Sequence, residues 1–171
     1  MCYLLYMASP LTLSEVRSML PPGITADLAL PEDQQALRAY LPAARTVVRL
    51  LSGSCSCNLV IGRDAGERSE ERHLRARWFE RGMPRAAMID ALYEHRKGAP
   101  YWREPLAAWH EALAGFIAEH ARNAGPTLYY LHFGPGHVAP KPGPPAEVPL
   151  ADTRARPGAW LQEGRPTVVS R

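Results

Sequence analysis

The stretch Thr46-Val47-Val48-Arg49-Leu50-Leu51-Ser52-Gly53-Ser54-Cys55-Ser56-Cys57-Asn58 joins an apolar run to a small polar loop that carries a Cys-x-Cys pair. The run at 46–51 is mostly apolar, which predicts a buried strand. The glycine and serines at 52–56 predict a loop, and the apolar residues 58–61 predict a returning strand. We therefore expect the two cysteines to lie in the loop of a β-hairpin.

Toward the N-terminus, the sequence predicts two strands and two helices. Residues 2–8 are continuously apolar, as in a central strand that is buried on both faces. Thr12 and Glu15 have the spacing of a capping box, which predicts a short helix that runs to Leu20. A weakly alternating segment at 24–30 predicts a second strand, and Pro31 begins a helix over 32–41.

Toward the C-terminus, three helices and further strands are predicted. The Gly82-Met83-Pro84 turn separates Arg-rich and Glu-rich helices at 67–81 and 84–97. A third helix is expected over 104–123, with an apolar stripe formed by Leu106, Trp109, Leu113, Phe116, Ile117 and His120. Residues 127–133 predict a strand, while six prolines and three glycines predict an extended loop at 134–149.

These elements predict a single compact domain of the α/β (α+β) class, with a four- to six-stranded mixed sheet covered by three to four helices. We expect residues 1–133 to form its core, 134–149 a Pro/Gly-rich loop, and 150–171 a segment that adds an edge strand to the same domain. The predicted core consists of Tyr3, Leu4, Leu5, Tyr6, Val48, Leu50, Trp109, Leu113, Phe116, Leu128 and Tyr130.

The composition indicates an ordinary globular protein. The 171 residues are 46% hydrophobic and 22% charged, and no apolar run reaches the roughly 20 residues of a membrane helix. The first eight residues lack the basic region of a signal peptide, and three cysteines are too few and odd in number for a secreted disulfide framework. We therefore expect a soluble, cytoplasmic protein that does not associate with membranes.

Several short motifs together resemble an uncharacterised family of small bacterial proteins. Met1-Cys2, Ala8-Ser9, Gly53-Ser54-Cys55-Ser56-Cys57 and Trp160-Leu161-Gln162-Glu163 are similar to that family's landmarks. The chain departs from the pattern at Ser56, where a second glycine is expected, and at 58–59, where a large aromatic residue is expected. The resemblance implies a compact α/β domain and no particular activity.

The Cys-x-Cys pair favours a thiolate function. Two cysteines at i and i+2 of an extended segment point to the same side, so both sulfurs could bind one soft ion such as Zn²⁺ or Cu(I). The remaining ligands would be Cys2, His132 and His137, if the fold brings them together. The same thiols could instead sense oxidants through a reversible disulfide, or they could simply be buried as small apolar side chains.

The alternative is a non-catalytic interaction protein that docks a partner through its Arg-rich helices or its Pro-rich segment. The order strand, helix, turn and helix over 58–96 resembles a ribbon-helix-helix DNA-binding module. However, the strand at 58–61 is apolar and the arginines are interleaved with acidic residues, which argues against nucleic-acid binding. No catalytic constellation is recognisable, which favours a protein that is not an enzyme. Whether the chain is a monomer or a homodimer stays open at this point.

Overall fold

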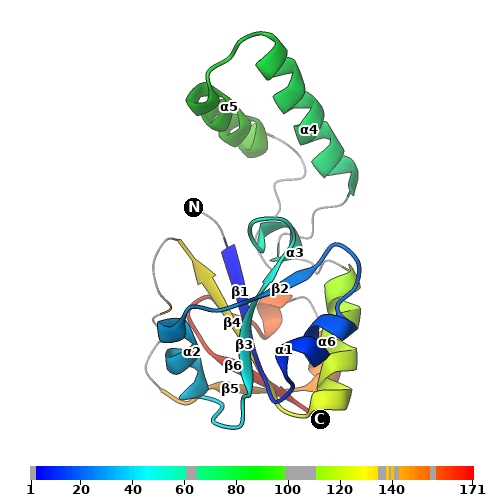
Figure 1. Ribbon diagram of the computed structural model, residues 1–171, viewed down its shortest axis with the longest axis vertical. Helices are drawn as coiled ribbons and strands as arrows, with labels where there is room; N and C mark the ends of the chain where they lie inside the picture. The colour runs from blue at the N-terminus through cyan, green and yellow to red at the C-terminus, as the bar shows by residue number, and fades with distance from the viewer. Residues whose placement is uncertain are drawn as a thin grey trace. The chain divides into compact units, whose positions relative to one another are not determined.

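The computed structural model describes residues 3–60, 65–98, 111–134, 138, 140, 143–154 and 157–171. For residues 65–70, 72, 96–98, 111 and 154 it describes the backbone alone. The chain separates into two compact units, Met1–Gly62 with Pro105–Arg171, and Arg63–Glu104. Figure 1 shows the β-sheet in the first unit and a helical hairpin in the second.

The first unit is built on a mixed six-stranded sheet with the order β2-β3-β1-β4-β6-β5. All neighbouring strands are antiparallel except β5 and β6, which are parallel. This confirms the predicted α+β class and the prediction of a central strand near residues 2–8. The strands are β1 (Tyr3–Ser9), β2 (Thr25–Leu28), β3 (Thr46–Leu51), β4 (Thr127–Phe133), β5 (Ala146–Pro149) and β6 (Thr167–Ser170).

Helices cover both faces of the sheet, and successive residues of β1 feed two separate cores. Leu5 and Met7 belong to one cluster, with residues of α1 (Leu13–Met19), α3 (Cys57–Val60) and α6 (Glu111–Ala124). On the opposite face, a second cluster contains Tyr6, Ala8 and Leu37, the last from α2 (Pro31–Arg38). The alternation of side chains along a strand is the reason why one continuous apolar run supplies both clusters.

Local signals set the starts of the first two helices as predicted. The Thr12 hydroxyl accepts the Glu15 backbone N–H, and the Glu15 carboxylate accepts the Thr12 N–H at 2.7 Å. This reciprocal pair is the predicted capping box at the start of α1. Pro31 occupies the first turn of α2, where its missing N–H costs no hydrogen bond.

The prediction of a returning strand at 58–61 was wrong, because Cys57–Val60 form the short helix α3. The backbone N–H groups of Leu59 and Val60 both donate to the Ser56 carbonyl, so the chain coils directly after the cysteine loop. Leu59 and Val60 are fully buried. A short apolar run that is buried looks the same in the sequence whether it is a strand or a helical turn.

Two predictions for the C-terminal part were also wrong. The segment 134–149 was expected to be a loop or an extended segment outside the packed elements, but Ala146–Pro149 form the strand β5 of the sheet. The strand β6, expected at an edge, instead pairs with β4 on one side and with β5 on the other. Since β5 is the edge strand and pairs along one side only, it tolerates a proline that cannot donate a backbone hydrogen bond.

The helices predicted near 67–81 and 84–97 are present as α4 (Ala65–Glu80) and α5 (Arg85–Gly98). Both helices belong to the second compact unit, and the expectation that they cover the sheet stays a prediction. A Schellman motif ends α4, with Gly82 at a φ of 70° and hydrogen bonds from its N–H to Phe79 and from the Met83 N–H to Trp78. The expected start of the third helix at 104 and its residues Leu106 and Trp109 lie outside the described residues.

No helix in the described part of the chain is long and apolar enough to cross a membrane.

A buried histidine ties α6 to the sheet. The ring of His120 has no exposed surface and lies with Nε2 at 3.0 Å from Ser9 Oγ and Nδ1 at 3.2 Å from Thr127 Oγ1. Because the Thr127 hydroxyl donates to the Gly125 carbonyl, Nδ1 must carry the proton and Nε2 must accept from Ser9. Burial lowers the pKa of His120 to about 4, so the neutral ring is the form that the fold requires.

Acidification should therefore destabilise the protein through His120. The unfolded chain takes up this proton near pH 6.5 and the folded chain only near pH 4, so the free energy of unfolding falls as the pH drops between these values. The expected loss is up to about 3 kcal/mol relative to a His120→Gln variant, in which this titration is absent. Urea unfolding of both proteins from pH 7 to pH 4 measures it, and parallel pH profiles would contradict the assignment.

Candidate functional sites

The residue between the two cysteines, Ser56, holds the loop onto the sheet. Its fully buried hydroxyl accepts the Leu5 N–H at 2.7 Å and donates to the Leu50 carbonyl at 2.5 Å. Leu5 and Leu50 face each other in the β1–β3 register, so the hydroxyl bridges the two strands where their ladder ends. The Ser56 N–H also donates to the Tyr3 carbonyl at 2.9 Å. The loop thereby completes the hydrogen bonding of β1 beyond the end of β3.

The Cys57 thiol lies at the start of β1, beside Tyr3. Its sulfur accepts the backbone N–H of Tyr3 at 3.3 Å, and the Tyr3 ring lies 4.6 Å from the ring of Phe133. Burial raises the pKa of the Tyr3 hydroxyl, and the nearby Glu163 carboxylate and Cys57 raise it further. The start of β1, the cysteine loop and the Trp160–Glu163 motif therefore meet at one end of the sheet.

The five residues predicted as metal ligands are not brought together on one face. Cys57 packs against the cluster that contains Leu5, whereas His132 faces Leu4 in the β1–β4 register and therefore points to the opposite face. Cys55 and Cys57 are both half-buried, and the Cys55 carbonyl accepts the Ser52 N–H at 2.9 Å. Cys2 and His137 lie outside the described residues.

The sheet therefore separates His132 from the cysteine loop. Among the described residues, no group of three or more His, Cys, Asp or Glu side chains is arranged to hold a metal ion. A site for Zn²⁺ or Cu(I) that uses Cys57 would have to exclude His132.

The helical hairpin carries an apolar groove, which the sequence analysis did not single out. The groove lies between α4 and α5 and has a volume of about 620 Å³. Phe79 is 75% exposed, Ile89 60% and Tyr93 53%, while Leu92 is buried. Large apolar side chains gathered on an exposed surface mark interaction sites in soluble proteins. The residues that line the groove are Arg75, Ala76, Phe79, Arg85, Met88, Ile89 and Leu92.

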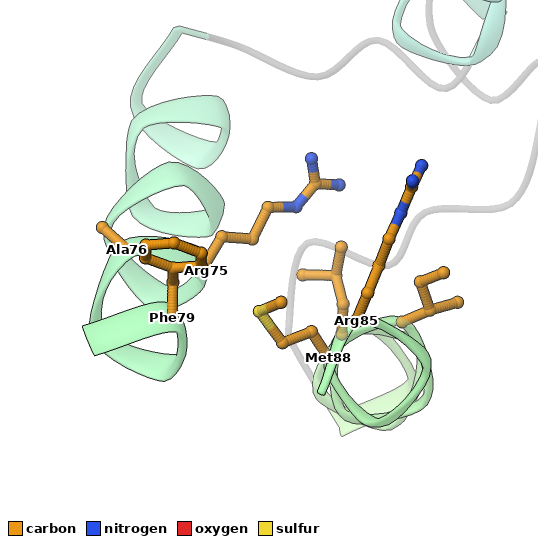
Figure 2. Close-up of a pocket in the computed structure, with 7 residues that line it drawn as sticks. Arg75, Ala76, Phe79, Arg85 and Met88 are labelled. Carbon is orange, nitrogen blue, oxygen red and sulfur yellow. The ribbon is translucent and has the colours of Figure 1, made fainter. Parts of the chain in front are cut away.

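Two arginines give the groove a basic end. Figure 2 shows the side chains of Arg75, from α4, and Arg85, from α5, extending toward the same end of the groove, with Met88 between the helices and Phe79 against α4. Both arginine side chains are exposed to solvent. The site thus combines an apolar floor with two cations at one end, a combination suited to a ligand that is both apolar and acidic.

Comparison with known proteins adds no family: no protein-family model, no curated protein and no solved structure matches this chain. The candidate sites therefore depend on the geometry alone.

Sequence reasoning overlooked Ser56, Phe79 and Ile89. Serine in a glycine-containing loop is ordinarily a turn residue, and nothing local indicates that this hydroxyl bridges two strands. The apolar residues of α4 and α5 were expected to face the sheet, so their exposure could not be read from periodicity. Phe79, which is followed by the charged residues Glu80 and Arg81, was the one available signal.

Replacing Ser56 with alanine should destabilise the protein strongly. The substitution leaves the Leu5 N–H and the Leu50 carbonyl buried without a partner, at a cost of about 2–4 kcal/mol in the free energy of unfolding. Ser54 in the same loop is exposed and provides the matched control, since Ser54→Ala should change stability by less than about 0.5 kcal/mol. Urea unfolding of the two variants compares them, and equal effects would refute the bridging role of Ser56.

Proposed function

We propose that the protein is a non-catalytic interaction protein whose α4–α5 hairpin binds an amphipathic helix of a partner protein. The observation that carries the proposal is the groove between the two helices, lined by Phe79, Met88 and Ile89. Helices that bind in such grooves insert apolar side chains spaced at i, i+3, i+4 and i+7.

The size of the unit supports this function. The hairpin belongs to the unit Arg63–Glu104, and Leu92 is the buried apolar side chain in its described part. Units of about 40 residues seldom bury enough apolar surface to be stable without a further contact. Covering Phe79 and Ile89 would remove the largest exposed apolar surface of the hairpin from water, which favours association.

The charges at the groove define the chemistry of the partner. Arg75 and Arg85 lie together at one end, so the bound helix should carry glutamate or aspartate beside its apolar face. Nucleic acid fits less well, because the exposed positions of the two helices also carry Glu80, Asp90 and Glu94. In addition, residues 58–60 belong to the helix α3, so a ribbon-helix-helix module would lack its strand there.

A model peptide tests the groove directly. An amphipathic helical peptide with leucines at i, i+3, i+4 and i+7 and flanking glutamates should bind, and the double variant Phe79→Ser/Ile89→Ser should weaken binding at least about tenfold. Both positions are exposed, so the substitutions should leave the fold intact. Fluorescence anisotropy measures the Kd, and circular dichroism verifies the helices.

A charge swap supplies the control. Arg75→Glu/Arg85→Glu should reduce affinity for the glutamate peptide and increase it for a peptide with lysines in place of the glutamates. Leu28→Ser, at a similarly exposed apolar position on the edge strand β2, should change neither affinity. Equal binding of both peptides to all variants, or no binding of either, would overturn the proposal.

A second candidate function is thiol chemistry at the cysteine loop, and the contact from the Tyr3 N–H to the Cys57 sulfur supports it. A backbone donor at the sulfur stabilises the thiolate, which is the form that binds soft metals and reacts with oxidants. Cys55, two residues away, is half-buried and would be the second thiolate ligand or the resolving thiol.

The two cysteines should account for any binding of Zn²⁺ or Cu(I). Cys55→Ser/Cys57→Ser should lower metal affinity at least about tenfold, whereas His132→Gln should not, because this ring lies on the other face of the sheet. Competition with a chromophoric chelator under reducing conditions gives the affinities. A wild-type protein that binds neither metal and whose thiols do not react with a disulfide reagent would exclude this function.

A further inference from the structure

The sheet face covered by α2 carries a row of polar residues that the proposed function does not use. In the strand register Arg49 of β3 faces Tyr6 of β1, and Tyr6 faces Tyr130 of β4, so all three side chains lie on one face. The Tyr6 hydroxyl donates to Asp33 Oδ2 at 3.1 Å, and the Val138 N–H donates to Asp33 Oδ1 at 2.9 Å. Both oxygens of this buried carboxylate therefore accept hydrogen bonds.

Two side-chain nitrogen atoms on the same face lack a hydrogen-bond partner among the described residues. Arg49 Nε and His132 Nε2 are buried and have no hydrogen-bond partner among the residues that the structure describes. A buried polar atom without a partner costs free energy, so such an atom calls for a partner that comes from elsewhere. Both atoms can donate a hydrogen bond, and the guanidinium of Arg49 always carries a positive charge.

The register places these two nitrogens around one partly exposed apolar residue. His132 faces Leu4, and Arg49 faces Tyr6, the next residue of β1 on this face. Leu4, Arg49 and His132 are each partly exposed, in contrast to the fully buried Tyr6 and Tyr130. Figure 1 shows α2 over one end of the sheet, while the start of β1 and the end of β4 extend past it. Because Leu4, Arg49 and His132 retain exposed surface, a small ligand can reach these side chains from solvent.

We propose that Arg49 and His132 bind the anionic group, a carboxylate or a phosphate, of a small ligand that lies over Leu4. The guanidinium fork of Arg49 matches the oxygens of either group, and His132 Nε2 would donate from the other side of β1. The Asp33 carboxylate accepts from Tyr6 and Val138, and Arg49 Nε makes no hydrogen bond to it. The exposed Asp27 faces Arg49 from β2, so the anion should approach from the β4 side.

Titration with inorganic phosphate and with succinate tests the site and distinguishes the two kinds of anion. In ¹H–¹⁵N spectra of the whole protein, the Arg49 Nε–H signal should shift and saturate with a Kd in the millimolar range, while chloride at equal ionic strength leaves it unchanged. Arg49→Gln and His132→Gln should each weaken binding at least about tenfold, measured by calorimetry. Arg165→Gln removes an exposed arginine elsewhere on this unit and should have no effect.

Arg49→Lys separates a specific contact from net charge, since lysine keeps the charge without the planar fork and should restore only part of the affinity. A wild-type Arg49 signal that responds to neither anion would overturn the site, and this measurement does not depend on whether any variant folds. Binding that survives both Arg49→Gln and His132→Gln would also overturn it. Neither result would bear on the α4–α5 groove, which belongs to the other unit.

Discussion

The first unit depends on the hydrogen bonding of β1, a strand buried in the middle of the sheet. Its two neighbours pair with different lengths of β1. The strand β4 pairs with β1 from Tyr3, whereas β3 pairs with it only from Leu5 onward. The backbone of Tyr3 would lack partners on the β3 side if the chain turned away after Leu51. The Ser56 and Cys57 backbone and side-chain atoms fill this place, which explains why a polar loop is drawn into an apolar core.

The same constraint limits what the cysteines can do. Ser56 is fixed by three hydrogen bonds to β1 and β3, and it sets Cys55 at the end of a turn and Cys57 at the first residue of a helix. The simple geometry of two side chains on one side of an extended segment does not apply to such a loop. The surroundings of Cys57 are instead defined by Tyr3, whose backbone N–H donates to the Cys57 sulfur.

The helical hairpin differs from the sheet in that its turn is encoded locally while large apolar side chains stay exposed. Its turn is encoded locally, since Gly82 adopts the positive φ that the Schellman motif requires and Pro84 directly precedes α5. Its apolar residues are not all buried within the hairpin, since Phe79 and Ile89 are 75% and 60% exposed. The exposed apolar residues of the hairpin and the buried sheet thus belong to separate units of one chain.

The sequence by itself determined the elements whose signals are local: the apolar strand β1, the capping box of α1, the Pro31 start of α2 and the glycine turn after α4. Hydrogen bonds and periodicity within a few residues carry these signals. Only the tertiary structure decided that 57–60 is helical, that β6 is internal and the proline-containing β5 lies at the edge, and that the sheet separates His132 from Cys57. The helix at 57–60 depends on the hydrogen bond between Ser56 and Leu5, which are 51 residues apart. The positions of β5, β6 and His132 depend on the order of the strands in the sheet. Local residue spacing encodes neither of these.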